Sequence, residues 1–325
     1  MVELAGRVRG WHRPMLIFGG LMAAVAVGCV VALAVDDRVL LGAPIWLKPL
    51  KFAISMVAYC VVWAWLYGLL DRGRRLANWL SSAIVLFMVV EYGIIVIQVA
   101  RGRPSHFNMS TPLDSAMWTT MAVTIAALWL ATLVLTVQVL RTPIADPASR
   151  WAVRLGTAIS LVGLALGALM TTAPAQTRPT AHGEFTQMVG AHSVRVPDGG
   201  PGMSLTGWSM TGGDLRIPHF VGMHALQAMP LLVVLLEVLA RRLPRLRPAQ
   251  VRARLVVTAA VGYAGLVALV TWQAERGQPL LRPDLLTLAA LGVLLGGVLV
   301  ATGYCLRRPL TGPPTGAPTP AGVAA

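Results

Sequence analysis

Eight long apolar runs divide this chain, and they constrain its fold more than any other feature. Each is about 20 residues long, the length of helix that crosses roughly 30 Å of hydrocarbon. They lie at 14–35, 49–70, 79–100, 117–140, 152–172, 217–240, 254–273 and 284–305. With 56% hydrophobic and 12% charged residues, a chain of 325 residues also has too little polar surface to cover a soluble globule. The sequence therefore predicts an all-α, polytopic membrane bundle of about eight transmembrane helices.

Arginines gather in alternate connections between these runs and predict the orientation of the chain. They crowd the N-terminus and the loops 71–78, 141–154 and 241–254. Under the positive-inside rule these segments are cytoplasmic, so we expect a protein of the bacterial cytoplasmic membrane with both termini inside. The net charge of +14 is then mainly a topology signal. Because the basic residues are spread over short loops, the lipid bilayer is the expected partner and nucleic acid is not.

Two stretches about 175 positions apart indicate an internal duplication. Gln98-Val-Ala-Arg101-Gly102 and Gln273-Ala-Glu-Arg276-Gly277 each end an apolar run. Upstream, segments 47–52 and 215–220 each begin a run with a basic residue, a proline and a basic-Phe pair. The pattern predicts two parallel four-helix halves, 1–150 and 151–308, with a long extracytoplasmic loop at 172–216 in the second. Paired halves of this kind usually place a site at their interface.

The two ends of the chain have separate interpretations. Arginines before the first run and a small-residue site near Ala32-Leu-Ala34 resemble a cleavable signal peptide, but the long apolar core favours an uncleaved anchor. The Pro-rich segment 309–325 has too few apolar groups to pack and is expected to be disordered. Three cysteines without a C-x-x-C pair indicate neither a disulfide framework nor a thiolate metal cage.

Histidines concentrate on the predicted outer side. The loop 172–216 is far longer than usual connections between helices and is predicted to be a functional cap, with a short amphipathic helix near 181–191. Imidazoles with carboxylates nearby suit Zn, Cu or Fe, and a haem is a further possible cofactor. The candidate metal ligands are His106, His182, His192, His219 and His224.

Two carboxylates are candidate catalytic or proton-handling groups. Glu91 lies inside an apolar run, near the expected bilayer midplane, where an ionised carboxylate costs several kcal/mol unless it is paired or hydrated. The alternative for Glu91 is a protonated side chain that bonds to a neighbouring helix. Asp214 lies at the end of the cap, beside Arg216, and could supply a second acid or base.

Lys48 and Lys51 are the only lysines among 27 basic residues, and both begin the second run. An ammonium there could bind an anionic or lipid-like ligand, or it could simply extend to the membrane interface beside Trp46. With polar residues expected on the same side, they form the candidate substrate-binding set. This set is Lys48, Lys51, Gln98, Arg101, Asn108, Arg216 and Gln227.

Four segments, LKPLKF, RGRPSHFN, VPDGGPG and GGDLRIPHFVGMHALQ, resemble a family of bacterial multi-pass membrane proteins. That resemblance covers most of the bundle and implies no activity. The eight-helix, duplicated layout is also similar to that of haem A synthases, which ligate haem through paired helix histidines. The chain departs from them, because its second, fourth and eighth runs contain no histidine and Met56 occupies the position matching His224.

Two functional classes remain open from the sequence. The first is a membrane enzyme or redox protein with an outward-facing metal or haem centre, and with the basic residues holding an anionic substrate. The second is a transporter or receptor for a small ion or anionic solute, with Glu91 as the proton-coupling site. Because the cytoplasmic half of the runs is nearly all apolar apart from Glu237, the pattern favours an outward-facing site over a transport path.

Overall fold

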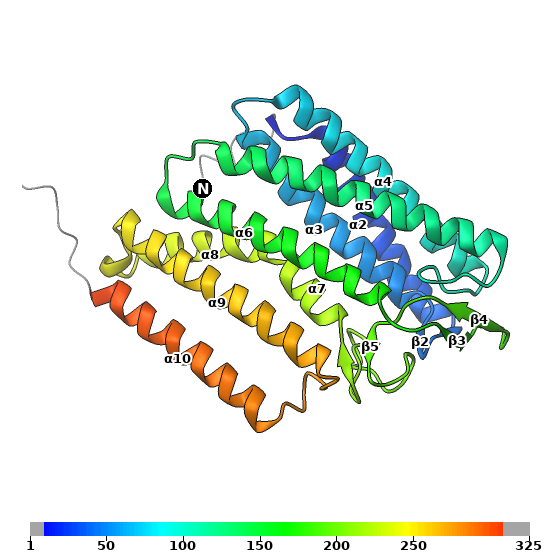
Figure 1. Cartoon of the computed structure of the whole chain (residues 1–325). Coiled ribbons are helices and arrows are strands. Elements are labelled where there is room, and N and C mark those ends of the chain that lie inside the picture. Colours follow the sequence, from blue (N-terminus) through cyan, green and yellow to red (C-terminus); the bar gives the residue numbers. More distant parts are fainter. Residues whose placement is uncertain (1–9, 308–325) are drawn as a thin grey trace, which may run out of the picture.

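The computed structural model describes residues 10–307 and forms a bundle of long helices (Figure 1). Seven helices in the described range are long and apolar enough to cross a membrane, and a further pair, bent by 43°, makes an eighth if it is counted as one span. The α-helices are α2 (Arg13–Val35), α3 (Leu47–Leu69), α4 (Arg74–Ala100), α5 (Pro112–Arg141), α6 (Pro147–Leu166), α7 (Arg216–Met223), α8 (Ala225–Ala240), α9 (Ala249–Glu275) and α10 (Leu285–Arg307). The prediction of an all-α membrane bundle is confirmed, while the predicted disordered tail, 309–325, lies outside the described residues.

Except for α10, helix starts lie one to five residues before the predicted apolar runs, because polar first turns were not counted. The hydroxyl of Thr111 accepts a hydrogen bond from the backbone N–H of Asp114, and Pro112 occupies the first turn of α5. Asp146 caps α6 in the same way through Ser149. Since α6 begins at Pro147, the expected boundary between halves at 150/151 falls inside its first turn.

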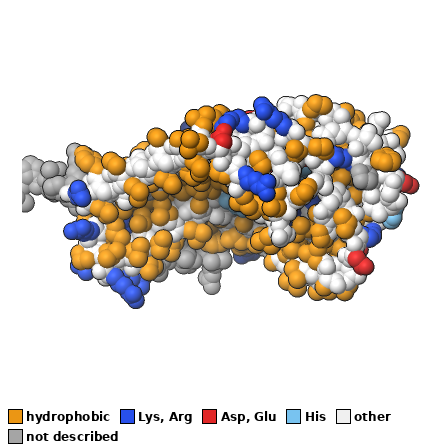
Figure 2. All heavy atoms as spheres, turned by 90° about the horizontal axis from the view of Figure 1, so that it is seen from below, with side chains coloured by type: hydrophobic (Ala, Val, Ile, Leu, Met, Phe, Trp, Pro, Cys, Tyr) orange, Lys and Arg blue, Asp and Glu red, His pale blue; other side chains and the backbone are white. Residues whose placement is uncertain are grey.

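The outer surface of the bundle is apolar, as a membrane requires. Hydrophobic side chains are spread along the whole face in Figure 2, and the Lys and Arg side chains form separate small groups on it. On α10 only 6% of the span is buried, and Leu285 and Val293 are about four-fifths exposed. A surface of this kind is stable against lipid and not against water.

Helix packing does not by itself establish two four-helix halves. Helix α2 packs mainly on α3, α4 packs on α5, and α10 packs on α9. Helix α6, however, contacts α7, α8 and α9 extensively, whereas the corresponding contact of α2 with α4 is small. The bundle therefore has its strongest helix cluster around α6.

The bend between α7 and α8 is held by close backbone packing and by side-chain hydroxyls. Gly163 of α6 lies directly against Gly222 of α7, with no space for a side chain at either position. Ser160 donates a hydrogen bond to the carbonyl of Met223 at 2.8 Å, and Tyr263 donates one to the carbonyl of Val221 at 2.6 Å. These bonds satisfy backbone carbonyls that the break would otherwise leave unpaired in the bundle.

All the strands lie at one end of the bundle, here called the cap end, and the arginine loops lie at the other (Figure 1). Three antiparallel pairs form there within the described residues. They are β1 (Val39–Leu40) with β2 (Ala43–Pro44), β3 (Gln176–Pro179) with β4 (Phe185–Met188), and β5 (Ser193–Val194) with β6 (Gly213–Asp214). Residues 172–215 are called the cap. The short 3-10 helices are η2 (Gly167–Thr171), leading into the cap, and η3 (Pro244–Leu246) at the arginine-rich end.

The predicted amphipathic helix at 181–191 is wrong, because β3 and β4 form a hairpin there. Burial along β4 alternates, with Thr186 and Met188 buried and Phe185 and Gln187 exposed, which is the two-residue period of a strand. Gly183 adopts a φ of 79° in the turn, a conformation that favours glycine. The prediction relied on the apolar spacing and did not account for the Thr-Ala-His-Gly turn before it.

Candidate functional site

Lys48 lies at the centre of a polar site where α3 meets the cap. Its half-buried ammonium lies 6.0 Å from the centre of the Phe52 ring, the distance of a weak cation–π contact. Among the described residues, no hydrogen bond or salt bridge pairs this ammonium. The charged groups that act on it come from the same helix, from α4 and from the second half of the chain. They are Lys51, Arg216, Glu91 and Asp198.

His106 extends this site from the loop between α4 and α5. Its ring packs edge-on against Phe52 at 5.4 Å and lies 6.1 Å from the ring of Trp118. Ser105 Oγ is 3.0 Å from His106 Nδ1. Burial holds the pKa of His106 well below its ordinary value of 6.5, and the charge of Lys48 lowers it further. His106 is therefore neutral at pH 7.

His192 reaches the same site from the cap and is oriented by Asp198. The Asp198 carboxylate accepts the backbone N–H groups of His192 and Ser193, and its Oδ2 lies 3.2 Å from His192 Nδ1. This arrangement favours the tautomer in which Nδ1–H donates to Asp198 and Nε2 is the free acceptor. Burial lowers the pKa of His192, while the hydrogen bond with Asp198 opposes that shift. The imidazole is held in one orientation beside Phe107, with 5.5 Å between ring centres.

Asp198 was not among the residues that the sequence assigned to the site. It lies in the Pro197–Gly202 turn, where an aspartate is usually explained by loop geometry. In the structure its pKa is held well below the ordinary range, because its hydrogen bonds with His192 outweigh the opposing effect of burial. Only the folded cap brings this carboxylate under His192.

Lys51 and Arg216 complete the cationic side of the site, but each has a partner. Lys51 donates a hydrogen bond to the carbonyl of Thr206 at 2.9 Å. Arg216 pairs with Asp214 at 2.6 Å and also donates to the carbonyl of Gly207. Asp214 is fully buried and additionally accepts the N–H of Ser209 at 2.7 Å. Its oxygens are used in holding the cap, which gives Asp214 a positioning role, and a catalytic role for it stays a prediction.

Glu91 is buried, as expected, but it is not at the middle of the helices. The hydroxyl of the next residue, Tyr92, donates to the carbonyl of Pro49 in the first turn of α3, and the charge of Lys48 acts on Glu91. Both observations place Glu91 towards the cap end. Thr124 of α5 donates a hydrogen bond to Glu91 Oε1 at 2.6 Å. That contact is also the one expected of a purely structural glutamate.

Two predicted substrate-binding residues, Gln98 and Arg101, bond to Asp114, and a third, Asn108, bonds to the cap. Gln98 Nε2 donates to Asp114 Oδ1 at 2.9 Å, and Arg101 pairs with the same oxygen at 2.5 Å. Arg103 joins Asp114 to Glu184 in the β3–β4 turn. Asn108 Oδ1 accepts from Thr186 at 2.7 Å and from Ser110. Asn108 and Arg103 therefore attach the cap to the α4–α5 connection, while Gln98 and Arg101 hold the end of α4 to the start of α5.

The duplicated sequence motif forms the same local turn twice. Gly102 and Gly277 have φ values of 65° and 73°, each directly after the helix-ending arginine. Arg101 pairs with Asp114 and Arg276 pairs with Asp284, each carboxylate lying at the start of the following helix. The geometry of this turn accounts for the repeated Gln-x-x-Arg-Gly pattern.

The five histidines do not converge on a metal site. His182 lies against Gly102, His219 Nδ1 is 2.8 Å from the carbonyl of Gly163, and His224 Nδ1 is 3.2 Å from Gln227 Oε1. Between residues 10 and 307, no three His, Cys, Asp or Glu side chains are grouped to hold one metal ion. His224 and Gln227 satisfy each other, so Gln227 does not join the Lys48 site.

We expect the protein to lose stability when the pH falls from about 7.5 to about 5. The folded state binds a proton on His106 only well below pH 6.5, whereas the unfolded chain binds it near 6.5. The stabilisation is therefore complete above pH 6.5 and is lost as the pH falls towards the folded pKa. Melting temperatures of wild type and His106→Gln at both pH values test this. The variant should lose less on acidification, since His192 still contributes, and an equal loss would contradict the assignment.

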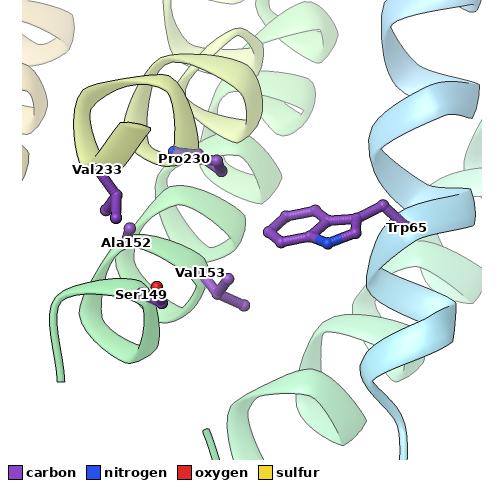
Figure 3. Close-up of a pocket in the computed structure, with 6 residues that line it drawn as sticks. All are labelled: Trp65, Ser149, Ala152, Val153, Pro230 and Val233. Atoms are coloured by element: carbon purple, nitrogen blue, oxygen red, sulfur yellow. The ribbon is translucent and has the colours of Figure 1, made fainter. Parts of the chain in front are cut away.

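The crevice between α3, α6 and α8 offers no second polar site. Trp65 faces Ser149, Ala152 and Val153 of α6, with Pro230 and Val233 of α8 beside them (Figure 3). Its lining is apolar apart from the hydroxyl of Ser149, which is buried without a hydrogen-bond partner among the described residues. The polar groups that could bind a ligand gather at the cap end.

No family model, no curated protein and no solved structure matches the chain. The site geometry is thus the basis for any functional assignment.

Proposed function

We propose that this membrane protein binds a small anion, or the anionic headgroup of a lipid, from the outer side of the cytoplasmic membrane. The observation that carries the proposal is the unpaired ammonium of Lys48 beside Lys51 and Arg216. Since Asp214 is paired with Arg216 and Asp198 accepts three N–H groups of the cap, the nearby carboxylates are largely occupied. A phosphate or carboxylate would supply the missing counter-charge, as it does for buried lysines elsewhere.

Neutral imidazoles make the site selective for ligands that can accept and donate hydrogen bonds. His106 and His192 lie near Lys48, and the charge of Lys48 acts on each imidazole. The aromatic rings of Phe52, Phe107 and Trp118 exclude water from the space around them. In this low-dielectric setting a bound anion interacts more strongly with the ammonium than it would in water.

The site lies where the proposed halves of the chain meet. Lys48 and His106 come from the first half, and His192 and Arg216 come from the second. The repeated Gln-x-x-Arg-Gly turn supports the proposal of a 4+4 parallel duplication, and the arginine-rich loops at the opposite end support an outward-facing site.

Proton-coupled transport of the anion is the second candidate, favoured by the buried Glu91 beside Lys48. Below this point, however, α3 and α4 contribute an apolar core that includes Met56, Trp63 and Ile84. A path for an ion to the other side would have to cross that core. Binding at the cap end therefore has stronger support than transport.

We expect Lys48→Gln to weaken anion binding by about 10-fold to 100-fold, because a hydrogen bond to a charged group contributes roughly 1.5–3 kcal/mol. The probes are inorganic phosphate and acetate by calorimetry in detergent, and phosphatidylglycerol against phosphatidylcholine nanodiscs by native mass spectrometry. Arg282→Gln is the control, since Arg282 is an exposed cation in the α9–α10 connection at the same end.

Binding of phosphate or acetate alone would identify a free anion, and retention of phosphatidylglycerol alone would identify a lipid headgroup. Either result supports the proposal only if Lys48→Gln reduces it and Arg282→Gln does not. Equal binding by all three proteins, or no binding of any probe by wild type, would overturn it.

A further inference from the structure

A second, separate cleft of about 690 Å³ opens within the cap. One wall is formed by residues 172–174 and by β3, and the other by β5 and the segment 195–197. Leu169, Leu215 and Glu275 complete the lining. This volume lies within the usual range of binding sites, and none of the residues of the Lys48 site lines the cleft.

The strand on one wall has a free edge. That strand is β3, and one of its edges pairs with β4. The other edge of β4 pairs with the loop at Asn108, because Met109 N–H donates to Gln187 O and Val189 N–H donates to Phe107 O. In an antiparallel ladder, two opposite residues either both direct their N–H and C=O groups towards each other or both direct them outwards. Gln187 directs its C=O outwards, towards Met109. Thr177, which lies opposite Gln187, therefore directs its own N–H and C=O away from β4. Thr177 is exposed, and among the described residues no loop hydrogen bond uses its backbone.

The charges along the cleft favour an acidic ligand. Arg178 follows Thr177 on β3, and its Nε is buried without a partner among the described residues. Arg195, on the opposite wall, has an exposed side chain and a φ of 64°, a conformation uncommon for residues other than glycine. Its aliphatic stem lies over Gly277, where any side chain would collide with it. Glu275 is the one carboxylate in the lining, so two arginines leave a positive excess.

We propose that this cleft binds an extended, acidic segment of another polypeptide, which adds as a strand to the free edge of β3. Its backbone pairs with Thr177, and its alternate carboxylates face Arg178 and Arg195. Strand addition uses main-chain hydrogen bonds for affinity and side-chain contacts for specificity. The two arginines of the lining complement the charge of an acidic segment, and we assign that segment to a second protein. The inference is independent of anion binding at Lys48.

Thr177→Pro tests the backbone contact directly. Proline removes the N–H that faces the cleft but none of the hydrogen bonds between β3 and β4, since the free edge of a strand is where proline is tolerated. The probe is a fluorescent pool of acetylated hexapeptides with glutamate at alternate positions and Val or Thr between them. Its control is the same pool with glutamine in place of glutamate. Binding is measured by fluorescence polarisation with the full chain in detergent.

We expect the glutamate pool to bind at least about 10-fold more tightly than the glutamine pool, and Thr177→Pro to reduce binding at least about 10-fold relative to Thr177→Ala. Arg178→Gln and Arg195→Gln should remove the preference for glutamate, while Lys48→Gln should leave it intact. Melting temperatures verify that each variant is folded. No binding by either pool, unchanged binding by Thr177→Pro, or equally effective competition by inorganic phosphate or glutarate would overturn the proposal.

Discussion

Replacing Asp114 with asparagine is expected to lower the free energy of unfolding by about 3 kcal/mol, because it leaves two arginines without their shared buried counter-charge. The Asp114 side chain is 0% exposed and pairs with both Arg101 and Arg103. It also accepts hydrogen bonds from Gln98 and Thr111. Since Arg103 continues to Glu184 in the cap, the substitution should loosen the cap as well. The measurement is unfolding by SDS titration in mixed micelles, with hydrogen exchange of the β3–β4 hairpin.

The second copy of the motif provides the control for this prediction. Asp284 pairs with Arg276 in the same type of turn, but its side chain is 40% exposed. An exposed ion pair contributes little because water and salt screen it, so Asp284→Asn should change stability far less than Asp114→Asn. If the two variants were equally stable, burial of Asp114 would not be the source of its effect.

The second large effect is expected at the contact between α6 and α7. Gly163→Val should destabilise the bundle by at least about 3 kcal/mol, since overpacking that moves backbone is at the upper end of the usual range. A Cβ at position 163 would lie 2.2 Å from the carbonyl carbon of Gly222 and from the N atom of Met223. No rotamer change can relieve contacts with backbone. The hydrogen bond between His219 and the carbonyl of Gly163 would be disrupted by the same displacement.

Gly20→Val is the matched control, because Gly20 lies in the membrane span α2 and has no atom within 4 Å of a Cβ built there. The melting temperature and the elution profile in detergent should remain near wild type for this variant. For Gly163→Val we expect a large fall in melting temperature or aggregation. A well-folded Gly163→Val protein of wild-type stability would show that the helices are not packed as described.

The transmembrane part of the fold could be predicted from the sequence because membrane insertion depends on a local property. Each run of about 20 apolar residues defines its own helix, whatever its neighbours are. The break at His224 could not be predicted this way, since Gly222, two residues before it, does not by itself break a helix, and the bend depends on contacts with Gly163, Ser160 and Tyr263 from other helices. The cap was assigned incorrectly in part, because β4 is selected by pairing with residues 107–109, about 80 positions earlier.

The candidate site was predicted only in outline. Lys48, His106 and His192 stood out by residue type, and the structure places them together. Gln98, Arg101 and Asn108 carry the same chemistry, yet Gln98 and Arg101 bond to each other and Asn108 bonds to the cap. Sequence spacing cannot separate a polar group that binds a ligand from one whose hydrogen bonds are satisfied internally. That difference lies in tertiary contacts, as it does for Asp198 beneath His192.

The pairing of β4 with the loop at residues 107–109 also sets an order of assembly. The partners of Asn108 and Met109 belong to a segment that follows two further membrane spans, α5 and α6, in the chain. During synthesis the loop at residues 107–109 therefore emerges about 80 residues before β4, the strand that pairs with it. Until residues 185–189 reach the same side of the membrane, the backbone of that loop can bond only to water or to a chaperone. The α4–α5 loop of the first half can thus complete its hydrogen bonds only after β4 of the second half has been synthesised.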